Sequence, residues 1–144
     1  MDQKIDDQGV SRRTAICALS LIGVGVFTSA ESAVAATGVK ILSDGKVQVT
    51  LKSNPALKKV GGVVRIDDVK GKSIALVRTS TKAYTAVNLL CTHLGGQLFQ
   101  TGNQWKCEEH GATFTLAGKN IAGLATKALK QLPVKATASV VTVG

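Results

Sequence analysis

The sequence has few cysteine, histidine and aromatic residues. Its 144 residues include three cysteines, two histidines and one tryptophan, and aromatic residues make up only 3% of the chain. No pair of a nucleophile and a general base is evident. If both histidines have another role, no histidine remains for acid–base catalysis. The scarcity of aromatic side chains also means that valine, isoleucine and leucine have to fill the core. We therefore expect no catalytic activity from this chain alone.

Acidic residues are scarce as well. The chain has nine of them against 18 lysines and arginines, which gives a formal net charge of +9. This charge favours acidic partners and anionic surfaces. The basic residues are spread along the chain, and Tyr84 and Trp105 do not alternate with them, so nucleic-acid binding is not indicated. No internal repeat or low-complexity segment is apparent, and the length favours one domain.

Residues 1–35 have the composition of an export signal. Arg12-Arg13 precedes a run without charge over residues 14–30, and residues 33–35 fit the small-residue cleavage pattern. Paired arginines before a modest apolar run resemble a twin-arginine signal. We expect cleavage after residue 35 and a periplasmic domain over residues 36–144. The alternative is an uncleaved anchor in the inner membrane, because residues 14–30 are just long enough to span a bilayer.

The cysteines outside this signal and both histidines fall into two short segments. The first reads Cys91-Thr92-His93-Leu94-Gly95 and the second reads Cys107-Glu108-Glu109-His110-Gly111. Thirteen residues separate His93 from Cys107, which is enough for two strands and a turn, so a hairpin would bring the segments face to face. Thiolate and imidazole groups that converge in this way suit either zinc or an iron–sulfur cluster.

The two segments resemble the cluster-binding loops of the Rieske family, C-T-H-L-G-C and C-P-C-H-G-S. Residues 91–95 match the first loop at every position, and Cys107, His110 and Gly111 match the second. In that family two Cys hold one iron of a [2Fe-2S] cluster and two His hold the other. The resemblance therefore implies that Cys91 and Cys107 bind one iron and that His93 and His110 bind the outer iron.

Several positions depart from the family pattern. Respiratory Rieske subunits carry a disulfide between two further cysteines, where this chain has Gly96 and Glu109. A Ser and a Tyr that donate hydrogen bonds to sulfur are replaced by Ala112 and Phe114. Such bonds stabilise the reduced cluster, so their loss implies a low to intermediate reduction potential. The negative charges of Glu108 and Glu109 act in the same direction.

The segment that covers the cluster in many Rieske proteins is rich in proline. The corresponding residues 122–126 contain no proline. Leu94 and Leu124 either shield the site or are ordinary core or surface residues.

The chain from residue 39 onward predicts an all-β domain. Short runs of β-branched residues alternate with turn residues, and no pattern of a long helix is present. Strands are expected over residues 39–42, 47–51, 63–66, 73–78, 84–90, 97–100, 104–106, 112–116, 129–134 and 139–143, with one helical turn over 56–60. This spacing is typical of a sandwich or small barrel. The Rieske resemblance implies a β-sandwich whose cluster-binding subdomain consists of two loops at its tip.

Three functional hypotheses follow. The first is an exported one-electron carrier between redox proteins such as cytochromes or oxidoreductase subunits. The second is the iron–sulfur subunit of a cytochrome bc-type complex or of an exported oxidase similar to arsenite oxidase, which involves the membrane only if the N-terminal segment is not cleaved. The third is a structural zinc-binding module, although zinc sites of this composition usually space the first pair more widely than Cys-x-His.

Overall fold

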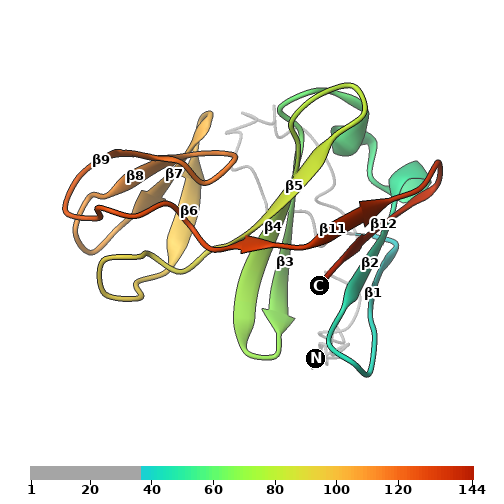
Figure 1. Ribbon diagram of the computed structural model, residues 1–144, viewed down its shortest axis with the longest axis horizontal. Helices are drawn as coiled ribbons and strands as arrows, with labels where there is room; N and C mark the ends of the chain where they lie inside the picture. Colours follow the sequence, from blue (N-terminus) through green and yellow to red (C-terminus); the bar gives the residue numbers. More distant parts are fainter. Residues whose placement is uncertain (1–36) are drawn as a thin grey trace, which may run out of the picture. The chain divides into compact units, whose positions relative to one another are not determined.

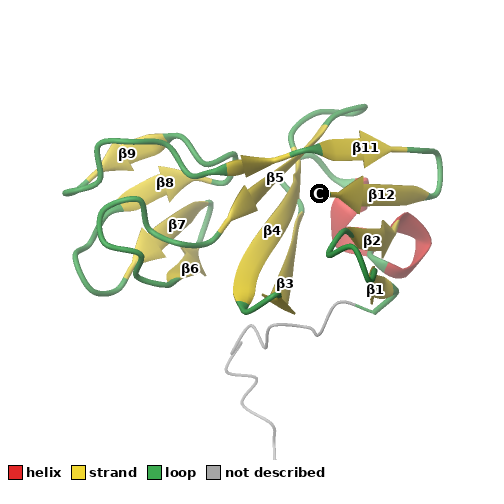
Figure 2. Ribbon diagram, turned by 60° about the horizontal axis from the view of Figure 1, so that its bottom comes forward, coloured by secondary structure: helices red, strands yellow, loops and turns green. Residues whose placement is uncertain are grey.

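The structure is a computed structural model that describes residues 37–144. In these residues the strands form three small antiparallel sheets (Figures 1 and 2). The elements are β1 (Val39–Ile41), β2 (Val47–Thr50), η1 (Leu51–Ser53), η2 (Pro55–Lys58), β3 (Val63–Val69), β4 (Lys72–Arg78), β5 (Tyr84–Asn88), β6 (Leu98–Thr101), β7 (Gln104–Cys107), β8 (Thr113–Thr115), β9 (Asn120–Ala122), β10 (Gln131–Leu132), β11 (Val134–Ala136) and β12 (Val140–Val143). The all-β prediction is confirmed.

The predicted export signal lies outside the described residues, so its structure and its boundary at residue 35 stay predictions. Within residues 37–144, no helix is long and apolar enough to cross a membrane.

Two of the sheets enclose an aliphatic core. Their strand orders are β1-β2-β12-β11 and β10-β5-β4-β3. Successive strand residues point to opposite faces, so Val47 and Val49 of β2 are buried while Gln48 between them and Thr50 after them are not. They pack with Leu76 of β4 and Val141 of β12. Valine, isoleucine and leucine supply this core, as the scarcity of aromatic residues predicts.

The third sheet, β6-β7-β8-β9, has a core of its own. Trp105 and Phe114 are opposite each other on β7 and β8, and both are fully buried. They pack with Ala75 and Val77, which lie on the face of β4 turned away from the first core. Figure 1 shows the third sheet on one side of β3–β5 and the strands β1, β2, β11 and β12 on the other. Strand β4 therefore contributes one face to each core.

Two expected strands differ from the structure by more than two residues, and the structure adds two short elements that the sequence did not predict, η1 and β9. The single strand expected over residues 129–134 is two strands, because Pro133 has no N–H for a continuous ladder. As a result, Leu132 pairs with β5 in one sheet and Val134 pairs with β12 in another. Strand β9 was not expected at all, and β3 runs three residues further than residue 66, with a bulge in which Asp68 has a φ of 59°.

Arg65 attaches the third sheet to the sandwich. Its Nη1 donates a hydrogen bond of 2.9 Å to the carbonyl of Leu98 at the start of β6, and its guanidinium lies 5.3 Å from the centre of the Phe99 ring. Its Nε donates to Asp67 at 2.9 Å. One side chain of β3 thus makes three directed contacts, and two of them cross to the third sheet.

This arrangement predicts a pH-dependent contribution to stability from Asp67. Partial burial disfavours the charged carboxylate, but hydrogen bonds from Ser73 and Arg65 outweigh it and hold the pKa of Asp67 below its ordinary value of 3.8. A carboxyl group with a lowered pKa stabilises the fold above its unfolded pKa and loses this effect as the pH falls through its folded pKa. We expect Asp67→Asn to cost about 0.2–1 kcal/mol at pH 7. In thermal melts, the difference from the wild type should begin to shrink as the pH falls below about 4 and should disappear only once the pH is below the folded pKa. Glu108→Gln, which removes the same charge from an exposed loop, is the control for the loss of one negative charge.

Candidate metal centre

The two predicted loops close by the same pair of backbone hydrogen bonds. In the first, the N–H of Cys91 donates to the carbonyl of Gly96 at 2.7 Å, and the N–H of Gly95 donates to the carbonyl of Cys91 at 2.8 Å. In the second, the equivalent bonds are Cys107 to Ala112 at 2.8 Å and Gly111 to Cys107 at 3.0 Å. Each loop thus turns back on its own cysteine, and each leaves the histidine at the turn.

Glycine at the fifth position of each loop is explained by backbone conformation. The φ angles of Gly95 and Gly111 are 79° and 67°, a region that other residues seldom adopt. A Cβ atom at either position would meet no atom within 4 Å, so lack of space is not the reason. The Cys-x-x-x-Gly spacing that both loops share is therefore a requirement of the turn itself.

The two cysteines lie together beneath the loops as free thiols. Cys91 is 3% exposed and Cys107 is fully buried. Burial raises the pKa of the Cys91 thiol and the neighbouring Cys107 thiol raises it further, while the backbone N–H groups of His93 and Leu94 act in the opposite direction. A thiolate is thus disfavoured in this place without a cation, and a bound metal ion reverses that balance because a coordinating thiol is deprotonated.

The two histidines form the outer pair. Their ring centres are 4.7 Å apart and the ring planes are nearly perpendicular, at 86°. The Nδ1 atoms of both rings are buried and have no hydrogen-bond partner among the described residues. The nearest carboxylate oxygen, on Glu109, is 3.8 Å from Nδ1 of His110, which is too far for a hydrogen bond. A buried nitrogen atom without a hydrogen-bond partner costs folding free energy, and coordination to a metal would give both Nδ1 atoms a partner.

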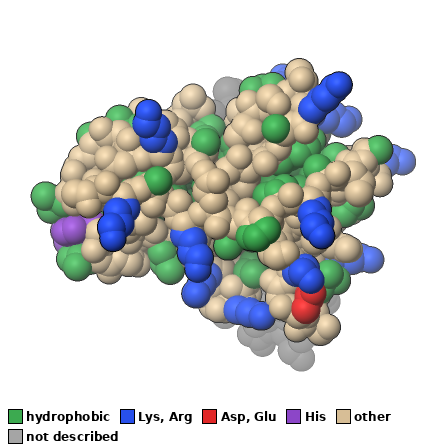
Figure 3. Space-filling view, viewed as in Figure 1, with side chains coloured by type: hydrophobic (Ala, Val, Ile, Leu, Met, Phe, Trp, Pro, Cys, Tyr) green, Lys and Arg blue, Asp and Glu red, His purple; other side chains and the backbone are tan. Residues whose placement is uncertain are grey.

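The donor atoms fit a cluster with two metal ions. Within residues 37–144, no three His, Cys, Asp or Glu side chains are grouped as ligands of one ion. Instead, the thiols form one pair deep in the third sheet's core and the imidazoles form another at the surface. Figure 3 shows the histidines at the end of the third sheet, with hydrophobic side chains beside them. A [2Fe-2S] cluster whose irons take two protein ligands each requires such a donor set.

The comparison with protein families decides the assignment of the chain. The model of the Rieske [2Fe-2S] domain family matches residues 45–133, more than half of the sequence. The chain belongs to the Rieske family. Its cofactor is accordingly a Rieske [2Fe-2S] cluster, and the domain transfers electrons to redox partners. The family resemblance seen in the two loops is thereby confirmed.

Solved Rieske structures show the same fold. The plasma membrane Rieske protein PetC3 from the cyanobacterium Synechocystis PCC 6803 is 27% identical, with a TM-score of 0.52 over 62% of this chain and 92% of that chain. The quaternary ammonium Rieske monooxygenase CntA, solved with L-carnitine, is 19% identical with a TM-score of 0.53. The match covers 63% of this Rieske chain but only 30% of CntA, and at this identity it shows the fold alone. A comparison with curated proteins found no match.

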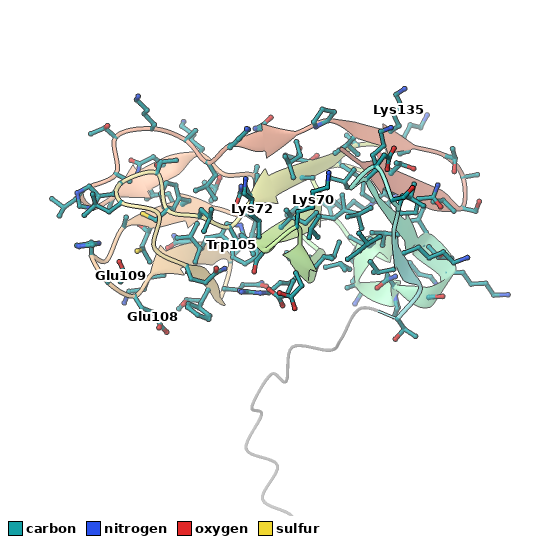
Figure 4. All side chains as sticks on the ribbon, turned by 90° about the horizontal axis from the view of Figure 1, so that it is seen from below. Lys70, Lys72, Trp105, Glu108, Glu109 and Lys135 are labelled. Carbon is teal, nitrogen blue, oxygen red and sulfur yellow. The ribbon has the colours of Figure 1, made fainter. Side chains whose placement is uncertain are left out.

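Of the residues that depart from the family pattern, some are buried and others are exposed. Ala112 and Phe114 are both fully buried in the core of the third sheet. Figure 4 shows Glu108 and Glu109 on the loop after β7, where both are exposed. A Cβ atom at Gly96 would lie 2.9 Å from a carboxylate oxygen of Glu109 and 3.1 Å from the sulfur of Cys107. Positions 96 and 109 are thus neighbours, as the disulfide of the respiratory subunits requires, and the Glu109 side chain fills the space between them.

The segment after β9 packs against both loops. The hydroxyl of Thr92 donates a hydrogen bond of 2.7 Å to the carbonyl of Lys127, and a Cβ atom at Gly123 would meet the backbone of Ala112. Leu94 and Leu124 are 70% and 62% exposed, so they are surface residues and not part of the core. This contact of Thr92 could not be predicted from the loop motif, because its hydrogen-bond partner lies 35 residues away.

Proposed function

We propose that this Rieske protein is an exported one-electron carrier in which Cys91 and Cys107 hold one iron and His93 and His110 hold the other. The observation that carries the proposal is the arrangement of four metal-binding groups as a buried sulfur pair and an outer imidazole pair on two loops of the same backbone geometry. The unpartnered Nδ1 atoms of both histidines support coordination through that nitrogen.

The bound cluster supplies a one-electron couple. The chain buries Cys107 fully and leaves Cys91 only 3% exposed, whereas the side chain of His110 remains 30% exposed, so the imidazole edge is the route by which an electron reaches a partner. The exposed Leu94 and Leu124 would exclude water from the contact when a partner covers the histidines. A cytochrome or an oxidoreductase subunit with an apolar patch of its own is the expected kind of partner.

We further propose a low to intermediate reduction potential. Hydrogen bonds to sulfur favour the reduced cluster, and the buried side chains of Ala112 and Phe114 offer no donor. The carboxylate of Glu109 adds a negative charge near the outer ligands, although its side chain is 60% exposed and solvent screens it.

Metal analysis with EPR spectroscopy tests the cluster assignment. Purified protein should contain equal amounts of iron and acid-labile sulfide, two of each per chain, and the dithionite-reduced form should give a Rieske-type spectrum. One zinc per chain without sulfide would instead favour a structural zinc module and contradict the proposed ligands.

The second part of the proposal is export to the periplasm after cleavage at residue 35. Replacing Arg12 and Arg13 with lysine should trap the precursor in the cytoplasm, because paired arginines are what the twin-arginine pathway reads. Cell fractionation and mass spectrometry of the native protein measure the outcome. An intact N-terminus in the membrane fraction, together with a co-purifying large chain, would favour a subunit of a cytochrome bc-type complex or an oxidase similar to arsenite oxidase over a free carrier.

A further inference from the structure

A groove of about 630 Å³ lies on the sandwich, away from the proposed cluster site. Its walls are the two short helices η1 and η2, the β4–β5 connection and the β11–β12 turn. Figure 1 shows η1, η2 and the β11–β12 turn on the far side of β3–β5 from the third sheet, with the β4–β5 connection at the upper end of those strands. Whatever occupies this groove therefore leaves the histidine edge accessible.

The rim of the groove is cationic. Lys52, Lys58 and Lys82 are exposed on three different segments, and Arg78 lies among them, while no acidic residue lines the groove among the described residues. The positive potential of four cations around one concave surface attracts anionic groups. Four of the fifteen basic residues in residues 37–144 thus surround one concave surface.

Arg78 is held in place before any ligand arrives. Its Nε and Nη1 donate hydrogen bonds to the carbonyls of Ser80 and Leu57 at 3.0 and 2.8 Å, and its Nη2 donates to the carbonyl of Thr81. Its guanidinium also lies 5.5 Å from the centre of the Tyr84 ring. These contacts fix the position of the charge, so a ligand does not have to order this side chain.

The fixed guanidinium retains both charge and hydrogen-bonding capacity. The ion pairs within residues 37–144 involve Lys46, Arg65 and His110, and the partners of Arg78 are carbonyl groups only. A guanidinium has five N–H donors, of which three are used here, so two remain for a carboxylate. Charge-assisted bonds of this kind are stronger than neutral ones.

The floor of the groove is apolar and concave. These features favour a peptide over a lipid surface as the occupant. Leu51, Leu57 and Tyr84 line it between the cations, together with the hydroxyl-bearing residues Thr137 and Ser139 of the β11–β12 turn. Acidic side chains that alternate with apolar ones match both the rim and the floor. A membrane surface reaches the exposed rim lysines but does not follow a concave groove between three loops.

We propose that this groove binds an acidic segment of a partner polypeptide in which carboxylates alternate with apolar side chains. Such a contact would hold the partner at the sandwich while the histidine edge stays free. The proposal does not depend on the four cluster ligands, so failure of the metal analysis and failure of the binding experiment are distinguishable.

Fluorescence anisotropy with the full chain carrying its cluster tests the proposal. The probe is a fluorescein-labelled peptide with the sequence Glu-Leu-Asp-Leu-Glu-Leu-Asp, and a peptide with all acids replaced by Gln or Asn is the neutral comparison. The triple variant Lys52→Gln, Lys58→Gln and Lys82→Gln should bind the acidic peptide about tenfold more weakly at low salt.

The matched control is Lys106→Gln, Lys119→Gln and Lys127→Gln, which removes the same charge from the third sheet and the segment after β9 and should change the affinity by less than about twofold. Arg78→Lys, which keeps the charge but loses the planar fork, should weaken binding while an unchanged circular dichroism spectrum shows that the fold is intact. Equal losses in the two triple variants would overturn the proposal in favour of general charge attraction. Binding to phosphatidylglycerol vesicles that requires the groove lysines, without binding to the peptide, would overturn it in favour of a lipid surface.

Discussion

Cys107→Ala should leave the protein without its cluster, with iron and acid-labile sulfide falling from two of each per chain to background. The Cys107 thiol is fully buried at the end of β7, in contact with the thiol of Cys91. Alanine has no donor atom, and no other cysteine among residues 37–144 can take its place. Bound metal also contributes folding free energy, so the melting temperature should fall together with the iron content.

The measurement is iron and sulfide analysis combined with the visible and EPR spectra. Lys106→Ala, one residue earlier and exposed on the same strand, is the control and should keep its colour. If Cys107→Ala fails to fold, His110→Ala tests the same assignment at a partly exposed position. Retention of two irons and an unchanged spectrum in His110→Ala would contradict the proposed ligand set.

Phe114→Tyr and Ala112→Ser should each raise the reduction potential. Both side chains are fully buried in the core that contains the two thiols, at the positions where the family pattern has a Ser and a Tyr that donate hydrogen bonds to sulfur. A charge-assisted bond of about 1.5 kcal/mol corresponds to about 65 mV for one electron. Ala112→Ser should give the smaller shift if its hydroxyl bonds to a nearby carbonyl instead of to sulfur.

A redox titration of the wild type and both variants checks this prediction. Phe99→Tyr on β6 is the control, because that ring is 40% exposed beside Arg65 and lies outside the buried core. Family potentials span roughly −150 to +300 mV, and we expect the wild type in the lower half. A wild-type value near the top of this range, with no shift in either variant, would show that the missing hydroxyl groups do not set the potential.

Local sequence was sufficient to predict the two loops. The Cys-x-His and Cys-x-x-His spacings, each followed by glycine, specify a turn that depends on neighbouring residues only, and the structure has both turns. Most strands were predictable for the same reason, since alternation and turn residues are local signals. The fold class therefore followed from patterns that span a few residues each.

The remaining features depend on contacts between distant residues. In the sequence, Arg65 has the pattern of an ordinary strand residue. Its contact with β6 is evident only in the folded chain, because its hydrogen-bond partner Leu98 is 33 residues away. Strand β9 has three residues and an irregular register with β8, so it has no periodic pattern of its own. The change of sheet at Pro133 is visible in the sequence as a strand breaker, but only the tertiary fold decides which sheet each half joins.

Strand β4 gives one face to the sandwich core and the other to the core of the third sheet, and Arg65 joins the same two parts. A rotation between them would open a packed interior and break directed hydrogen bonds, so the domain has no internal hinge at this junction. The proposed redox tip can consequently approach a distant acceptor only if the whole domain diffuses or pivots toward it. If the acidic segment of a partner binds the groove on the sandwich, it would limit how far the domain can diffuse from that partner. The histidine edge would still be free to move toward the acceptor.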